Sequence, residues 1–274
     1  MPTCPICGAK IHESTRVCPA CRIDLPGSRA GGRSFNIGGS LFGIVVGGIL
    51  LLGCVIVIVL PIVQEKRGLV NRGSSESNLK NLALALHVYH DDHLSLPVAQ
   101  SQLDATAAAH GWQTRILPYV EERTIHAAID FDLPWDDAAH AAAFQKRIGL
   151  YLNPKIKRTH DFRGYALTHY AGNSHVLDRT PPIAFADITD GLANTILVGE
   201  VKDGLRAWGE PGNVRDPGLG LNHGPTTFGS VWQDGGVFFA AADGAVHRID
   251  GSTPPPFLHA LATPAGGERV TFPE

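Results

Sequence analysis

The chain has 274 residues and a formal net charge of −3, and no run of basic residues occurs in it. This charge balance argues against nucleic acid as the main partner, and the length suits more than one domain. The composition is strongly segregated. The first 40 residues are rich in Cys, Gly and Arg, residues 41–63 are almost wholly apolar, and the remainder is typical of soluble protein.

Four of the five cysteines lie in two Cys-x-x-Cys pairs near the N-terminus, Cys4/Cys7 and Cys18/Cys21. Zinc favours four thiolates in a tetrahedron, and each pair can place two of them on one side of the metal. So short a segment cannot build a hydrophobic core, so the metal would supply the folding free energy. We therefore predict a structural zinc ribbon over 1–26, with two disulfides or four free thiols as the alternative. Four thiolates complete the shell without His12.

Residues 27–40 are rich in Gly and Ser, which is typical of a flexible linker. No charged residue occurs between Arg33 and Glu65. The apolar run over 37–63 would be about 40 Å long as a helix, enough to cross a hydrocarbon core of about 30 Å. We predict a single transmembrane helix over 41–63. Gly39, Gly43 and Gly47 recur every fourth residue, which would permit self-association but is also common in membrane helices.

The orientation of this helix cannot be read from charge, because Arg and Lys flank both ends. Zinc thiolates persist best in a reducing cytosol. We therefore expect a cytosolic N-terminus, a single pass through the cell (inner) membrane, and an extracytoplasmic domain over 64–274.

Helical periodicity is clear in the segment Ser75–Asp92, where one face carries four apolar residues and Leu84 points away from it. These four residues are Leu79, Leu82, Leu86 and Tyr89. Gly68 and Gly73 disfavour helix, and the serines that follow favour a new N-cap. The pattern predicts a break near Gly73 and a helix from Ser75–Ser77 to about Asp92. A further helix is predicted from Pro118 to about Asp130.

Beyond residue 160 the sequence consists of short apolar stretches between turns. Strands are predicted over 195–200, 229–232, 237–243 and 245–249, and Asp243-Gly244 is typical of a hairpin turn. Because helices come first and antiparallel strands follow, the predicted fold class of this domain is α+β.

Four blocks of the chain together resemble one family. They are residues 60–99, the Trp/Leu-Pro-Tyr and Pro-Trp-Asp block over 111–137, the Thr-Asp-Gly block over 188–200, and the Asp-Gly hairpin over 235–249. They are similar to the pseudopilin-like family known as domain of unknown function 1559, which is related to type II secretion pseudopilins and prepilins. The resemblance implies a helix packed on an antiparallel sheet.

Two departures from the family pattern stand out. The prepilin leader of the family has a Glu at the fifth position after its Gly, whereas the apolar run here contains none. The closing family motif has a His separated by nine residues from its Asp-Gly, and Gln233 occupies that position before Asp243-Gly244. The resemblance therefore implies a divergent member in which a zinc ribbon and a plain anchor replace the pilin leader.

Motifs that carry chemistry are scarce. The chain has no Gly-x-Ser-x-Gly, His-Glu-x-x-His or phosphate-binding loop, so we predict no catalytic residue. Three sets of residues deserve comparison. A hydrogen-bonded role at the core rim is favoured over metal binding for His87, His90 and His93. Turn chemistry suffices for Asp187, Asp190, Asp234 and Asp243, although calcium remains open. Nothing beyond composition supports a triad of His223, Ser230 and Asp234.

These observations favour a non-enzymatic, membrane-anchored, pseudopilin-like structural or interaction protein of the cell envelope, whose ribbon docks a cytosolic protein partner. The alternative is a solute- or glycan-binding module presented at the membrane, with a groove lined by Trp112, Trp135, Trp208 and Trp232. Solvent-exposed tryptophans would favour that alternative, and buried ones would favour the structural role. An enzyme would require a pocket of convergent His and carboxylates.

Overall fold

The computed structural model describes residues 1–25, 66–99 and 108–273. The chain divides into two compact units, one on each side of the boundary between residues 62 and 63, which are treated separately. The predicted linker over 27–40 and transmembrane helix over 41–63, with Gly39, Gly43 and Gly47, lie outside the described residues. Within the part that is described, no helix combines the length and the apolar character needed to cross a membrane.

Residues 1–25, the described part of the first unit, form two tight turns, each closed by an isolated antiparallel bridge. Thr3 pairs with Lys10, and Val17 pairs with Asp24. Each turn contains one Cys-x-x-Cys pair.

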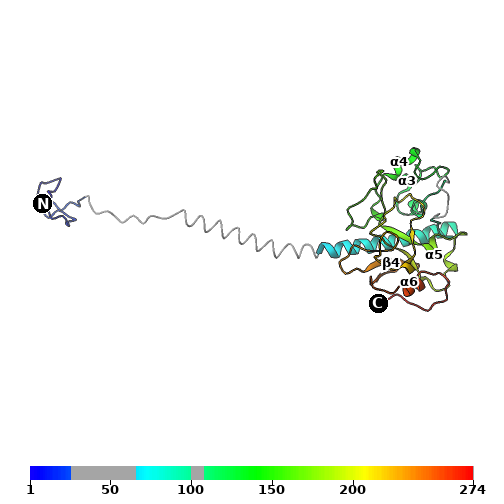
Figure 1. Ribbon diagram of the computed structural model, residues 1–274. Coiled ribbons are helices and arrows are strands. Elements are labelled where there is room, and N and C mark those ends of the chain that lie inside the picture. The colour runs from blue at the N-terminus through cyan, green and yellow to red at the C-terminus, as the bar shows by residue number, and fades with distance from the viewer. Residues whose placement is uncertain (26–65, 100–107, 274) are drawn as a thin grey trace. The chain divides into compact units, whose positions relative to one another are not determined.

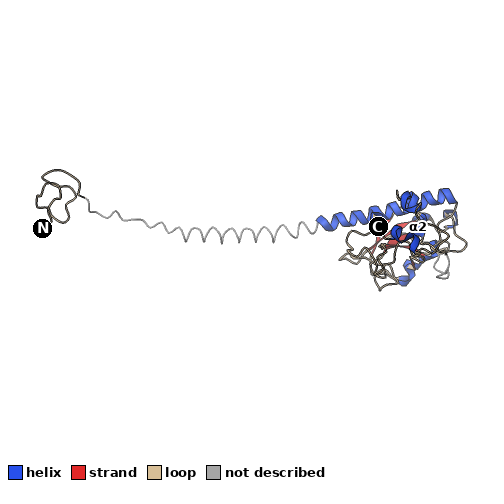
Figure 2. Cartoon of the chain, turned by 90° about the horizontal axis from the view of Figure 1, so that it is seen from above, coloured by secondary structure: helices blue, strands red, loops and turns tan. Residues whose placement is uncertain are grey.

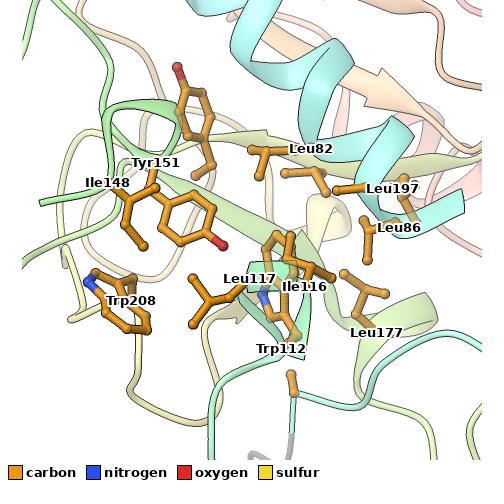
Figure 3. Close-up of a cluster of buried hydrophobic side chains, with 14 of the residues drawn as sticks. Leu82, Leu86, Trp112, Ile116, Leu117, Ile148, Tyr151, Leu177, Leu197 and Trp208 are labelled. Atoms are coloured by element: carbon orange, nitrogen blue, oxygen red, sulfur yellow. The ribbon is translucent and has the colours of Figure 1, made fainter. Parts of the chain in front are cut away.

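The second unit is built on a long helix whose described residues are 66–93, drawn in cyan in Figure 1. The predicted apolar face is confirmed. Leu79, Leu82 and Leu86 are fully buried, whereas Leu84 is 60 % exposed. Figure 3 places Leu82 and Leu86 against Leu197 of the sheet and Trp112 of the following segment.

The predicted break near Gly73 is wrong, because the helix runs through this residue without interruption. Two serines that could have capped a new helix are used otherwise. The Ser74 hydroxyl donates to the Val70 carbonyl one turn earlier, at 3.0 Å. Ser75 is fully buried, and its hydroxyl donates to Glu200 of the sheet at 2.6 Å. Tertiary hydrogen bonding thus outweighs the local preference for a cap.

The sheet has five strands in the order β3-β1-β2-β4-β5. All neighbouring pairs are antiparallel except β1 and β3, which are parallel. The strands are β1 (Tyr170–Asn173), β2 (Ile196–Glu200), β3 (Val214–Arg215), β4 (Val237–Ala241) and β5 (Val246–Ile249). The predicted α+β class and the hairpin at Asp243-Gly244 are therefore confirmed, with Gly244 at a φ of 89° in the turn.

The two faces of the sheet pack against different layers. This is visible in β4, whose successive side chains point alternately to one face and to the other. Phe238 and Ala240 join the core beneath the long helix, whereas Val237 and Phe239 belong to a second core on the other side. Leu258 of the short helix α6 (Pro255–Ala260) is fully buried in this second core. In Figures 1 and 2 the long helix lies along one face of the strands, and Figure 1 has α6 below β4.

The remaining helices are short and cover the region between the long helix and β1 or join the strands. They are α2 (Trp112–Arg115), η1 (Leu117–Tyr119), α3 (Arg123–His126), η2 (Ala138–His140), α4 (Ala141–Phe144), η3 (Gly149–Tyr151), α5 (Ser174–Leu177), η4 (Phe185–Asp187), η5 (Leu192–Asn194) and η6 (Pro217–Leu219).

Two predicted elements are corrected. The helix expected from Pro118 to Asp130 is divided into η1 and α3, because Glu121 between them has a φ of 66°, which no right-handed helix accommodates. The strand expected over 229–232 is a loop. In this loop the Gly229 amide donates to the Glu200 carbonyl, and the Ser230 amide donates to the Asn222 side chain.

A buried carboxylate connects the long helix to the sheet. Glu200 is 1 % exposed and accepts hydrogen bonds from the Ser75 hydroxyl, the Asn153 amide at 2.8 Å, the Trp232 indole at 2.9 Å and the Phe238 backbone at 3.1 Å. Burial raises the pKa of Glu200 to about 7. A salt bridge of 2.9 Å between Arg72 and Asp234 lies near this network.

We predict that Gly73→Ala stabilises the second unit. No atom lies within 4 Å of the position that a Cβ would take, so the change should gain about 1 kcal/mol of helix propensity. Gly199→Ala is the matched control, because its Cβ would overlap the ring of Phe239 and should cost about 1–3 kcal/mol. Denaturant unfolding followed by tryptophan fluorescence measures both, since all four tryptophans follow residue 63. A loss of stability for Gly73→Ala would contradict the continuous helix.

Candidate metal centre

The four N-terminal cysteines converge on one point. Their Sγ atoms all lie within 4.8 Å of one another, and all four thiols are free. The sulfurs of Cys4 and Cys21 are 3.8 Å apart, and those of Cys7 and Cys18 are 3.6 Å apart. The alternative of two disulfides does not describe this arrangement.

The two halves of the cluster share one local structure. The Gly8 amide donates to the Cys4 carbonyl, and the Arg22 amide donates in the same way to the Cys18 carbonyl. Both turns end in a left-handed residue, with a φ of 72° at Gly8 and 55° at Arg22. Each Cys-x-x-Cys pair thereby turns its two thiols to the same side, as the spacing predicted.

Hydrogen bonding within the cluster divides the thiols into two kinds. Backbone N–H groups, first that of Cys7, lower the pKa of Cys4, and the N–H of Cys21 lowers the pKa of Cys18 to about 6. The sulfur of Cys7 hydrogen-bonds to Cys21 and raises the pKa of that thiol to about 12.

The cluster fits zinc. With Zn–S bonds of about 2.3 Å, a tetrahedron has S···S edges of about 3.8 Å, close to the observed separations. The four-cysteine cluster is therefore compatible with a structural metal ion such as zinc. His12 lies apart and hydrogen-bonds to the Ser14 hydroxyl at 3.0 Å, as expected for a residue outside the shell.

The helical histidines do not gather into a site. His87 contacts the Ala242 carbonyl at 2.8 Å and stacks on Phe185, and the Phe185 amide donates to His90. His93 contacts the Tyr89 carbonyl within its own helix. The predicted role at the rim of the core is confirmed for His87 and His90.

The loop carboxylates are separate as well. Asp187, Asp190 and Asp243 accept hydrogen bonds from backbone amides of nearby turns or of residues 266–267. Asp234 pairs with Arg72 and Arg248. These four residues form no common metal-holding group within the described part of the chain. There is also no hydrogen bond there that joins His223, Ser230 and Asp234 into a triad.

The four tryptophans are all buried. Trp112 and Trp208 are fully enclosed, and Trp232 and Trp135 are 5 % and 8 % exposed. Figure 3 shows Trp112 and Trp208 inside the core, beside Ile116, Leu117 and Tyr151. The predicted aromatic groove is therefore not formed by these residues.

A second group of metal-ligating side chains was missed from the sequence. His175, Asp216 and His259 offer ligand atoms that all lie within 4.8 Å of one another. They come from α5, from the residue before η6, and from α6, so no local spacing links them and only the tertiary fold brings them together.

Comparison with protein-family models matches residues 72–174 to a family described as a protein of unknown function, DUF1559. This match supports the resemblance to the family that the sequence predicts, over that segment. Curated proteins and solved structures gave no significant match. The DUF1559 segment extends from the long helix through β1 to the start of α5, so it includes Ser75, Asn153 and Tyr170 of the buried network around Glu200.

Gln233, which differs from the pattern expected of the family, lies beside the same network. Gln233 is exposed. Its neighbour Trp232 donates to Glu200, and its other neighbour Asp234 forms a salt bridge with Arg72. The side chain that replaces the histidine of the DUF1559 closing motif thus stands next to the contacts that hold the long helix.

We predict that a peptide of residues 1–26 binds one zinc ion and is folded only with the metal, because the four thiolates supply most of its folding free energy. Circular dichroism and elemental analysis before and after chelation test this. Cys18→Ser should abolish metal-dependent folding, and His12→Ala should leave it unchanged. A reduced peptide that binds no zinc would contradict the assignment.

Proposed function

We propose that the chain is a non-enzymatic structural or interaction protein of the cell envelope, anchored by the apolar segment over 41–63, with a cytosolic zinc ribbon and a pseudopilin-like domain outside. The observation that supports this most is the unbroken helix over 66–93. Pilin-type subunits run one continuous helix from the membrane into the globular head. The absence of a break at Gly73 fits this architecture better than the hinge that the sequence predicted.

The first described turns of the long helix suit a membrane interface. Leu69 and Val70 are 64 % and 67 % exposed, and the exposed cations Lys66 and Arg67 stand beside them. Apolar side chains next to Lys and Arg are typical of the headgroup region, where the cations reach toward phosphate. These residues directly follow the apolar run, so we propose that they lie at the outer surface of the membrane.

The cluster of four cysteines supports a role of the N-terminal segment in docking a partner and not in catalysis. Four thiolates would fill the tetrahedral shell of zinc, so no coordination position would remain for a substrate. The ribbon would then present a metal-stabilised surface to a cytosolic protein. The rival role in solute or glycan binding loses its main support, because the four tryptophans are buried and cannot stack on a sugar.

Reporter fusions test the proposed anchoring and orientation. A reporter active only outside the cytosol should work after Glu274 and fail before Met1. Leu52→Arg should lower its activity and release protein from the membrane, because a central Arg costs roughly 2.5–3.5 kcal/mol of insertion free energy. Leu52→Phe is the control and should insert normally. Activity of the N-terminal fusion alone would contradict the orientation, and full-length protein in the soluble fraction would contradict the anchor.

A further inference from the structure

Three side chains of the second unit meet at a corner between α5, η6 and α6. The His175 Nε2 atom lies 3.0 Å from the Asp216 Oδ1 atom. The imidazole ring of His259 stands edge-on to that of His175, with 5.3 Å between the ring centroids. His175 and Asp216 are partly buried and His259 is exposed, so the group is reachable from solvent.

The backbone around this group is held by a buried amide. Asn173 is fully buried, and its Oδ1 atom accepts from the His175 amide at the start of α5. Its Nδ2 atom donates to the Ala262 carbonyl at 2.7 Å and to the Ile196 carbonyl at 2.8 Å. The Asn173 side chain thus connects α5, which carries His175, to β2. It also connects α5 to the residues just after α6, the helix that carries His259.

The third element is positioned by Asp216 itself. Its Oδ1 atom caps η6 by accepting from the Gly218 amide at 2.7 Å. A Cβ at Gly218 would come within 2.9 Å of the His259 Nδ1 atom and 3.0 Å of the Asp216 Oδ1 atom. Both ligand atoms therefore face the open side of Gly218, and glycine leaves room for them to approach each other.

We propose that His175, Asp216 and His259 bind a divalent transition-metal ion. Imidazole and carboxylate are suited to zinc and related first-row ions. Bonds of about 2.0–2.1 Å in a tetrahedron give ligand separations of about 3.3 Å, near the 3.0 Å between His175 and Asp216. A rotation of the exposed His259 side chain brings in the third ligand. Three protein ligands leave a position open to water or to an anionic ligand, unlike the closed cysteine cluster.

The donor chemistry also differs between the two units. No cysteine follows residue 63, so the second unit offers nitrogen and oxygen ligands only. These donors, unlike thiolates, need no reducing compartment. The site requires only the folded second unit, so it does not depend on the proposed anchoring.

Metal stoichiometry of the full-length protein tests this proposal. Purified protein is stripped with chelator, reloaded with zinc and measured by elemental analysis, with two ions expected per chain. The Cys4→Ser/Cys7→Ser variant removes the cluster and should retain one ion. Cobalt in that variant should absorb without the intense sulfur charge-transfer band that thiolate ligands produce.

Three further changes are made in the cysteine variant. His259→Ala alters an exposed side chain, and Asp216→Asn keeps an oxygen that can cap η6, so both should fold while weakening zinc binding at least tenfold. His93→Ala is the control, because this exposed histidine contacts its own helix, and it should leave affinity unchanged. Tryptophan fluorescence confirms folding. No bound zinc in the cysteine variant, or unchanged affinity in folded His259→Ala and Asp216→Asn, would overturn the proposal.

Discussion

The carboxylate of Glu200 is almost completely buried, and donors from three separate segments converge on it. A carboxylate at such a place is costly unless its oxygens accept hydrogen bonds. Ser75 meets this need from the long helix, Asn153 from the segment after η3, and Trp232 and Phe238 from the loop and strand beyond β3. The second unit can bury this group only when helix, loop and sheet are all in place.

This constraint accounts for the course of the long helix. The Ser75 hydroxyl donates to Glu200 and accepts from the Asn153 amide, so it is bound to the rest of the domain, and Gly73 lies only two residues before this buried contact. Arg72 adds a salt bridge to Asp234, which also pairs with Arg248 of β5. The contacts on either side of Gly73 thus hold both flanks of the glycine in one helix.

Sequence patterns predicted the elements that depend on local chemistry. The Cys-x-x-Cys turns, the spacing of Leu79, Leu82 and Leu86, and the Asp243-Gly244 turn each need only neighbouring residues, and each is present. The failures have tertiary causes. The local pattern predicts a cap at Ser75, whereas the partner of its hydroxyl, Glu200, lies 125 residues away in the sequence. β1 was missed because Gly172 and Asn173 disfavour strands. The folded structure explains both residues. Leu177 packs against the Cα of Gly172, where a side chain would not fit, and the Asn173 side chain donates to the Ile196 carbonyl. His175, Asp216 and His259 carry no signal before folding.

The hydrogen bond between Ser75 and Glu200 fastens the long helix to the sheet. A double-mutant cycle with Ser75→Ala and Glu200→Gln, measured by denaturant unfolding with tryptophan fluorescence, tests it most directly. The measurement is made at a pH well above 7, because burial raises the pKa of Glu200 to about 7 and the side chain must be ionised. Because hydrogen bonds to charged groups contribute about 1.5–3 kcal/mol, we expect a coupling energy of about 1 kcal/mol or more. The exposed Ser74→Ala, paired with Glu200→Gln, should be additive. Additivity within about 0.5 kcal/mol for Ser75 and Glu200 would contradict the account.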